Sequence, residues 1–361
     1  MVIAKIIGAA RRFVRRSPDA VLRGLLSREQ LVRILQRERA RSGRTGEVFS
    51  LVTFAVRSHK AGDETLRHLA KILQRRLRLT DDVGLWAEHQ IGVVLPATPA
   101  AGAWTVVGDV CVCVPAGLPL PLCSVYCYPS DWPSDGHGNG DQRAETSDAG
   151  RPARAMEELF VQRLPLWKRL IDVAGAVIGL LLLAPLLALV AVAIKVASPG
   201  PVLFRQRRVG LGGKTFTMYK FRTMVVTAEQ QQEKLMALNE QQGPVFKICN
   251  DPRITPLGRL LRTTSIDELP QLWNVLKGEM SLVGPRPPLD NEVRQYQPWQ
   301  GGRLDVTPGL TCIWQVQGRS TISFTEWMRL DIRYIRSRSV RQDIALLLRT
   351  VPAVLFRRGA S

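Results

Sequence analysis

The sequence predicts an α+β protein that has more than one domain and enters a membrane. A chain of 361 residues is long for a single domain. Helix-like and strand-like segments alternate up to about residue 128, and a long uncharged run lies between Asp172 and Lys195. The net charge of +19 indicates an anionic partner, which leaves nucleic acid, an acidic membrane surface and phosphorylated substrates open.

Residues 1–128 predict one sheet covered by two helices. The segments SREQLVRILQRERA and DETLRHLAKILQRRL have helical spacing of apolar residues, whereas EVFSLVTFAV and VGLWAEHQIGVVLP predict strands. The alternating run VCVCVP, with Cys111 and Cys113, predicts a further buried strand. The spacing of this pair to Cys123 and Cys127 is not a common zinc pattern, so we expect apolar packing of these thiols.

Residues 129–160 predict a flexible linker. The stretch YPSDWPSDGHGNGDQRAETSDAGRPAR is rich in Gly, Pro, Ser and Asp and has no apolar periodicity. His137 within it is expected to be a solvated loop residue.

Residues 161–200 predict a membrane segment. The uncharged run would form roughly 33 Å of helix, which is enough to cross a hydrocarbon core of ~30 Å, and it is apolar on every face. Lys168 and Arg169 precede the run and Lys195 follows it, so the positive-inside rule gives no direction. Pro185 at the midpoint removes one backbone hydrogen bond. We therefore expect a re-entrant helical hairpin that is kinked at Pro185 and has both ends in the cytoplasm.

The segment PGPVLFRQRRVGLGGKTFTMYKFRTM predicts two strands around a glycine-rich turn. Gly213-Lys214-Thr215 is similar to the end of a phosphate-binding loop, but Arg208 stands where that motif needs glycine, so a hairpin turn is expected. The surrounding basic residues could also contact anionic lipid headgroups; they are Arg205, Arg207, Arg208, Lys220 and Arg222.

The segment SIDELPQLWNVLKG places two adjacent acids at the start of an apolar stretch. Ser265 and Glu268 fit a capping box, but Pro270 would then lie inside the helix, where its missing N–H costs a hydrogen bond. A helix that begins at Asp267 avoids this cost and puts both carboxylates at a helix N-terminus.

Arginines flank these acids in the sequence. Arg259 and Arg262 precede them, Arg286 follows in the proline-rich loop GEMSLVGPRPP, and Arg319 follows in TPGLTCIWQVQGRS. Carboxylates beside several arginines and close to a membrane segment suit a diphosphate bound through Mg²⁺, although ordinary surface ion pairs would give the same pattern.

Residues from about 165 onward resemble the bacterial sugar transferase family, the monotopic phosphoglycosyl transferases that act on polyprenyl phosphate. The matching segments stand in family order and cover over half of the chain: LWKRLIDVAGAVIGLLLLAPL, SPGPVLFRQRRVGLGGKTFTMYKFRTM, NDPRITPLGRLLRTTSIDELPQLWNVLKGEMSLVGPRP, TPGLTCIWQVQGRS and LDIRYIRSRS. The resemblance implies a small α/β catalytic domain over 201–361 with interfacial amphipathic helices. It also implies a bacterial inner-membrane protein whose soluble domains both face the cytoplasm.

The resemblance further implies a reaction. A sugar-1-phosphate would pass from a UDP-sugar to undecaprenyl phosphate with release of UMP, at the start of exopolysaccharide or other surface-glycan synthesis. Asp267 would be the nucleophile and would bind Mg²⁺, with Glu268 as its partner in the dyad. The expected substrate- and phosphate-binding residues are Arg262, Arg286, Arg319, Lys220 and Arg222.

One departure concerns the hairpin kink. Family members often have Ser-Pro there, where the hydroxyl bonds a carbonyl freed by the proline, whereas this chain has Ala184-Pro185. The proline alone would have to hold the bend.

The N-terminal part has a second resemblance. DDVGLWAEHQIGVVLPATPAAGA aligns with the signature hairpin of diguanylate-cyclase-like (GGDEF) domains, but the signature falls on residues 87–91, AEHQI, which lack its glycines and metal carboxylates. We expect a degenerate, non-catalytic domain, with a plain ferredoxin-like module as the alternative and His89 as a simple hairpin residue.

The sequence disfavours two other functions. A catalytically inactive, membrane-anchored scaffold whose N-terminal domain senses a nucleotide is disfavoured, because the dyad and three arginines are retained. Nucleic-acid binding is not expected, because no motif of that kind accompanies the positive charge. A homo-oligomer stays open.

Overall fold

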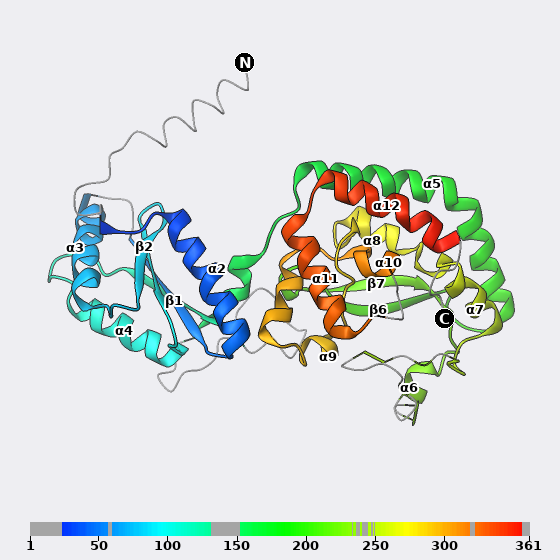
Figure 1. Ribbon diagram of the computed structural model, residues 1–361, viewed down its shortest axis with the longest axis horizontal. Coiled ribbons are helices and arrows are strands. Elements are labelled where there is room, and N and C mark those ends of the chain that lie inside the picture. The colour runs from blue at the N-terminus through cyan, green and yellow to red at the C-terminus, as the bar shows by residue number, and fades with distance from the viewer. Residues whose placement is uncertain are drawn as a thin grey trace, which may run out of the picture. The chain divides into compact units, whose positions relative to one another are not determined.

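The computed structural model describes residues 24–56, 60–130, 152–232, 250–317 and 322–355, together with a few positions between 234 and 248. These residues form two compact units, of which the first ends at Met156 and the second begins at Glu157 (Figure 1). Helices and sheets occur in both, so the predicted mixed fold is confirmed. His137 and most of the predicted linker lie outside the described residues.

The first unit is built on a five-stranded sheet with the order β2-β3-β1-β4-β5. All its pairings are antiparallel except β4 with β5. Helix α2 begins with a capping box in which Ser27 and Gln30 bond each other's backbone N–H groups. The elements are α2 (Arg28–Thr45), β1 (Phe49–Ala55), α3 (Lys60–Arg76), β2 (Asp82–Ala87), β3 (Gln90–Leu95), α4 (Ala100–Val112), β4 (Leu122–Tyr128) and β5 (Arg154–Ala155).

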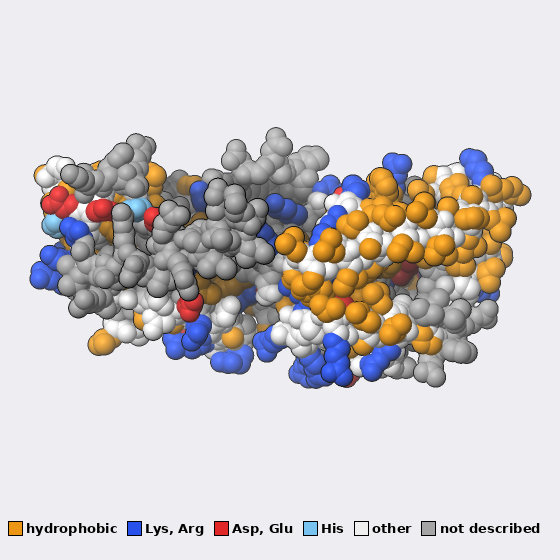
Figure 2. All heavy atoms as spheres, turned by 90° about the horizontal axis from the view of Figure 1, so that it is seen from above, with side chains coloured by type: hydrophobic (Ala, Val, Ile, Leu, Met, Phe, Trp, Pro, Cys, Tyr) orange, Lys and Arg blue, Asp and Glu red, His pale blue; other side chains and the backbone are white. Residues whose placement is uncertain are grey.

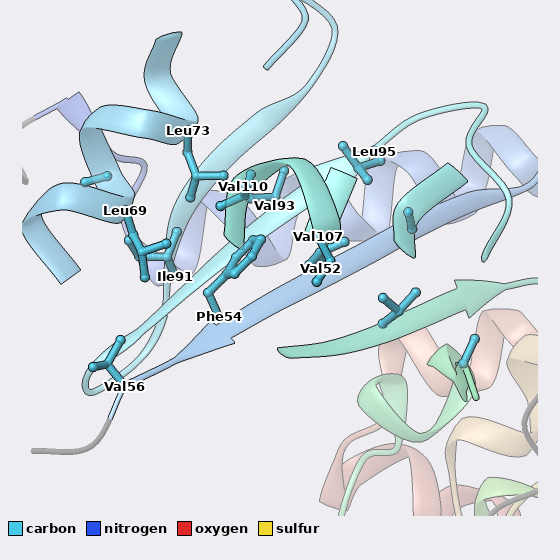
Figure 3. Close-up of a cluster of buried hydrophobic side chains, with 14 of the residues drawn as sticks. Val52, Phe54, Val56, Leu69, Leu73, Ile91, Val93, Leu95, Val107 and Val110 are labelled. Carbon is cyan, nitrogen blue, oxygen red and sulfur yellow. The ribbon is translucent and has the colours of Figure 1, made fainter. Parts of the chain in front are cut away.

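Alternating residues of the strands supply the core of this unit. Val52 and Phe54 on β1 lie with Ile91 and Val93 on β3 and with apolar side chains of α3 and α4 (Figure 3). On the opposite face a side chain at Gly92 would meet Leu31 of α2, so glycine lets this helix lie close to the sheet.

Two predictions for this unit are wrong. VCVCVP lies at the end of α4 and in the following turn, because this segment continues a helix whose buried face is Ala100, Ala103, Val107 and Val110. The sheet is therefore covered by three described helices, not two. Residues 154–160, which we assigned to the linker, form β5 and a 3₁₀ helix (Met156–Phe160).

The expected apolar packing is confirmed for three of the four cysteines. Cys127 lies in the core, and Cys111 and Cys123 pack against it with their sulfurs 3.9 Å apart. His89 lies in the tight turn between β2 and β3 with φ 56°, as expected for a hairpin residue.

The second unit surrounds the hairpin of β6 and β7, which was predicted from the glycine-rich turn. Gly212 and Gly213 both have positive φ in that turn. The elements are α5 (Leu166–Ala197), β6 (Leu203–Val209), β7 (Thr215–Phe221), α6 (Ala228–Gln232), α7 (Pro256–Thr263), η5 (Ile266–Glu268), α8 (Gln271–Lys277), β8 (Ser281–Val283), α9 (Asp290–Val293), η6 (Pro298–Asp305), β9 (Gly309–Thr311), α10 (Ile313–Gln317), α11 (Phe324–Ser337) and α12 (Val340–Leu355).

Helix α5 is the described helix that is long and apolar enough to cross a membrane. It contains Ala184 and Pro185 and bends as it passes along the outside of the unit (Figure 1). Much of its apolar surface is exposed, and apolar side chains gather on this face of the unit (Figure 2). Exposed positions include Leu170, Ile178, Leu181, Leu182, Leu189 and Val192. A soluble core helix would bury them.

The basic residues at the start of α5 have partners within the second unit. Lys168 is buried and forms an ion pair with Asp343 of α12. Arg169 donates to the carbonyls of Val275 and Leu276 at the end of α8. These two charges therefore satisfy partners inside the protein.

Candidate active site

A cavity of about 1140 Å³ in the second unit brings most of the predicted site residues together. Its walls come from β6, β7, α7, η5, the loop after β8, and α11. The predicted residues that line it are Lys220, Arg222, Arg262, Asp267, Glu268 and Arg286. Arg319 lies outside the described residues.

The two acids lie on a 3₁₀ turn rather than at the start of a helix. The Ser265 side chain makes no capping bond, and its backbone has φ 54°, a conformation that is strained for a non-glycine residue. Helix α8 begins only at Gln271, after Pro270, so neither the capping box nor a helix start at Asp267 is correct. Pro270 lies between the 3₁₀ turn and α8, so its missing N–H removes no hydrogen bond from either element.

Glu268 is fixed by two cations. Its Oε1 accepts a hydrogen bond from Lys220 Nζ at 2.7 Å and one from Arg286 Nη1 at 3.3 Å. Burial opposes the ionised form, but Lys220 and Arg286 outweigh it and hold the pKa of Glu268 well below its usual range. Glu268 is therefore a carboxylate at neutral pH.

Asp267 has a different environment. Its side chain is buried, and no described residue donates a hydrogen bond to it. Burial and the adjacent charge of Glu268 raise the pKa of Asp267 to about 6, against the opposing effect of Lys220, Arg262 and Arg286. The carboxylate is thus ionised at neutral pH but less stabilised than its neighbour.

Arg262 reaches the cavity because α7 lies close to the end of the β7 segment. Its Nε donates to Thr223 Oγ1 at 2.9 Å. A Cβ at Gly258 would lie 2.0 Å from the Thr223 carbonyl oxygen, so α7 requires glycine at this crossing.

Lys220 is positioned through β7 and α8. The Asn274 side chain accepts a bond from the Tyr219 N–H at 3.1 Å and donates to the Thr217 carbonyl at 2.7 Å. The buried Asn274 amide thus bonds the backbone of β7 as a neighbouring strand would. These bonds hold α8, and with it the two acids that precede α8, close to Lys220 on β7.

Arg222 has a different contact from the one predicted. Its two terminal nitrogens donate to the Ser198 carbonyl, the Ser198 hydroxyl and the Pro199 carbonyl at 2.7–2.8 Å. These bonds hold the chain at the end of α5. A phosphate-binding role for Arg222 remains a prediction.

Sequence reasoning missed several residues that shape the cavity. Arg303 donates to the Arg286 carbonyl at 2.8 Å and pairs with buried Asp331 at 2.7 Å, which orients the Arg286 loop. Arg208 lines the cavity but was considered only as a headgroup contact. Side chains alternate between the two faces of β6, so Arg208 shares a face with Gln206 and Phe204. This alternation is a sequence signal that could have placed Arg208 in the cavity.

The carboxylates are compatible with Mg²⁺. Among the described residues no group of three or more His, Cys, Asp or Glu side chains could hold a metal. Magnesium is, however, commonly bound by one or two carboxylates together with substrate phosphates and water. The oxygens of Asp267 and the second oxygen of Glu268 fit such a site.

Comparison with known proteins agrees with this geometry. The model of the family "Bacterial sugar transferase" matches residues 163–357. The galactosyl transferase CpsE of Streptococcus agalactiae is 46% identical over 194 residues, which are 54% of this chain and 43% of CpsE. The UDP-glucose:undecaprenyl-phosphate glucose-1-phosphate transferase of Caulobacter vibrioides is 45% identical over 54% of this chain and 71% of its own length. ExoY of Rhizobium meliloti, an exopolysaccharide production protein, is 38% identical over 54% of this chain and 87% of ExoY. This chain thus spans less than half of the length of CpsE.

Solved structures similar to this chain include GGDEF domains. That of DgcB from Caulobacter crescentus is 17% identical, with a TM-score of 0.27 over 31% of this chain and 77% of that chain. The diguanylate cyclase SiaD from Pseudomonas aeruginosa is 24% identical, with a TM-score of 0.26 over 35% of this chain and 57% of that chain. TM-scores this low do not establish a shared fold, and the GGDEF-like interpretation of the first unit stays a prediction.

The match of the family model covers residues 163–357, which are more than half of the chain. The chain therefore belongs to the bacterial sugar transferase family.

Proposed function

We propose that the protein transfers a sugar-1-phosphate from a UDP-sugar to undecaprenyl phosphate and releases UMP, in the synthesis of a surface polysaccharide. The observation that carries this proposal is the Asp267 carboxylate. It is buried in a large cavity, has no described hydrogen-bond donor, and is influenced by three cations. Such a group is available to react with an anionic, phosphorylated substrate.

The two acids have separate roles. Glu268 has one oxygen committed to Lys220 and Arg286, so it orients these cations. Asp267 makes no comparable bond, and its raised pKa makes it the more nucleophilic carboxylate. Asp267 is therefore the nucleophile.

The reaction has two displacements. A carboxylate oxygen of Asp267 attacks the phosphorus that carries the sugar, and the bond from that phosphorus to the bridging oxygen breaks, with the electron pair leaving on UMP. The resulting acyl phosphate is attacked by an oxygen of undecaprenyl phosphate, which breaks the bond to Asp267 and restores the carboxylate. Lys220, Arg262 and Arg286 stabilise the charge of the phosphoryl oxygens. A Mg²⁺ ion held by Asp267, with the free oxygen of Glu268 nearby, would supply further charge neutralisation when bound.

The contacts of α5 support a proposed membrane arrangement. Near its start, Lys168 contacts Asp343, and just after its end, Ser198 contacts Arg222. Both ends are thus tied to the same unit, which supports a helix that enters and leaves the cytoplasmic leaflet without spanning. The undecaprenyl phosphate would then reach the cavity from the inner membrane.

The test is an assay of UMP release by the full chain in detergent, with Mg²⁺, undecaprenyl phosphate and a panel of UDP-sugars. UDP-glucose and UDP-galactose are the first choices, because relatives are named for these sugars. We expect UMP release with at least one of them, together with a lipid-linked sugar diphosphate. Absence of both products with every UDP-sugar would contradict the proposal.

A further inference from the structure

Arg208 is a cation of the cavity that the mechanism above does not use. It lies on β6 opposite Phe216 of β7, and its side chain lines the cavity together with Lys220 and Arg286. Its neighbour Arg207 points to the other face of the hairpin, where it donates to Thr215 Oγ1.

The Arg208 guanidinium is held in place by uncharged hydrogen-bond partners, while the charges of Glu292 and Glu268 act on it from beyond ion-pair distance. Its Nε and Nη2 donate to Gln206 Oε1 at 3.0 and 2.8 Å, and its Nη1 donates to the Pro287 carbonyl at 3.1 Å. Both partners are uncharged, and no described carboxylate forms an ion pair with Arg208. A partly buried charge that has no ion-pair partner is incompletely compensated, so the arrangement favours an anionic ligand.

The Arg286 loop contacts both Arg208 and the dyad. Its guanidinium contacts Glu268, while the carbonyl that fixes Arg208 belongs to the next residue, Pro287. The charges that act most strongly on Asp267 are those of Glu268, Lys220, Arg262 and Arg286. Burial and the charge of Arg286 lower the pKa of Arg208 to about 10, against the opposing effect of Glu292 and Glu268. A diphosphate that presents one phosphorus to Asp267 would extend its second phosphate past Arg286 toward Arg208.

We propose that Arg208 and Arg286 form a second phosphate subsite, which holds the phosphate that departs with the nucleoside. The inference rests on the proposed function and adds a residue to it. When the bridging oxygen leaves the transferred phosphorus, its electron pair remains on UMP, whose phosphate gains one negative charge. Arg208 is placed to stabilise that charge, and the Gln206 amide positions Arg208 for it.

Three variants of the full chain test the subsite. Arg208→Gln removes the cation. Gln206→Glu keeps Arg208 but gives it a carboxylate that neutralises it through the same two bonds, so it weakens phosphate binding without removing the arginine. Arg207→Gln is the matched control, because it removes an equal charge from the same strand on the face away from the cavity.

The first measurement is calorimetric titration of the detergent-solubilised variants with UMP in the presence of Mg²⁺. Loss of a charge-assisted contact should weaken UMP binding about tenfold to a hundredfold in Arg208→Gln and in Gln206→Glu. Single-turnover UMP release from the UDP-sugar should slow in both variants. Arg207→Gln should match the wild type. Equal UMP binding by Arg208→Gln and Arg207→Gln would overturn the inference.

The second measurement distinguishes two ligands that Arg208 could bind, the phosphate of UMP and the phosphate of undecaprenyl phosphate. Protein loaded with sugar phosphate is mixed with undecaprenyl phosphate, and the rate of lipid product formation is compared. We expect Arg208→Gln to transfer from the loaded state at nearly the wild-type rate. A defect confined to this step, with normal UMP binding, would assign Arg208 to the lipid phosphate and overturn the nucleotide assignment. If the wild type releases no UMP from any UDP-sugar, the proposed function fails, whatever Arg208 does.

Discussion

At the scale of single residues, two neighbouring acids of the site differ in the hydrogen bonds that they accept. Glu268 is bonded to Lys220 and Arg286, whereas Asp267 has no described donor. The strained backbone of Ser265 turns the chain immediately before them. Adjacent residues of a 3₁₀ turn point in different directions, which lets one carboxylate orient the cations while the other reacts.

Replacement of Asp267 tests this division. Wild-type protein given a UDP-sugar and Mg²⁺ without lipid should release about one equivalent of UMP and gain the mass of a sugar phosphate, because the aspartyl adduct forms in the first step. Asp267→Asn should do neither, since the amide is similar in shape but a poor nucleophile. Glu268→Gln should form the adduct more slowly, because Lys220 and Arg286 lose their ionic partner. Intact-mass measurement follows the adduct. Near-normal UMP release by Asp267→Asn would show that the lipid phosphate attacks directly.

Arg286 tests the importance of guanidinium geometry. Lysine at this position would keep the charge but could not bond Glu268 and a phosphate oxygen with the same planar group. We expect Arg286→Lys to lower kcat/KM for the UDP-sugar about tenfold or more, on the scale of a lost charge-assisted bond. Arg294→Lys is the control, because Arg294 follows the last residue of α9 and pairs with Asp290 at the surface. Equal activity of both variants would remove Arg286 from the phosphate site.

At the scale of elements, α8 and β7 are joined through the Asn274 side chain. Asn274→Leu has a similar size but leaves the Tyr219 N–H and the Thr217 carbonyl without their partner. Each orphaned group costs about 1–3 kcal/mol, so we expect a lower melting temperature of the solubilised protein and reduced UMP release. Asn291→Leu on α9 is an exposed control. Unchanged stability of Asn274→Leu would mean that α8 is held by its apolar contacts alone.

The bend of α5 gives the next prediction at this scale. Cysteines placed at Arg163 and Pro201, in a chain without native cysteines, should both be labelled from the cytoplasm. Pro185→Ala restores the hydrogen bond that a straight helix needs, so it should shift part of the population toward spanning and expose the Pro201 position to periplasmic labelling. Ala184→Ser keeps the proline and should not shift it. Cytoplasmic labelling alone in Pro185→Ala would show that the anchors at Lys168 and Arg222 set the topology.

Elements with a strong local pattern could be predicted from the sequence, whereas contacts between elements could not. The helical spacing of α2 and α3 and the glycine turn between β6 and β7 are local signals, and both were correct. VCVCVP alternates over too few residues to distinguish a strand from the last turn of α4. Arg222 was predicted to bind phosphate because the sequence does not show that Ser198 lies beside it, and it does not show that Asp343 pairs with Lys168. Their partners come from distant segments, which only folding brings together.

At the scale of the whole molecule, the described residues form two units with separate cores. The first has its own sheet and its own apolar core, and the described helices α2, α3 and α4 cover the sheet. The proposed reaction uses residues of the second unit alone. The first unit is therefore not needed to assemble the candidate active site, and its contribution has to be measured separately from sugar transfer.

The last prediction concerns this first unit. If it has GGDEF ancestry, its signature would fall on the hairpin of β2 and β3, where His89 and Gln90 stand in place of the two acids of the signature and offer no carboxylate to a metal. His89 adopts the positive φ of the turn, so the hairpin keeps its shape without glycine, and its ring lies 3.2 Å from Asp63. We therefore expect the full chain to make no cyclic dinucleotide from GTP and Mg²⁺, by chromatography against an active diguanylate cyclase as positive control. A dinucleotide product that persists in Asp267→Asn would show that the first unit is catalytic, because that substitution removes the proposed nucleophile of the other site.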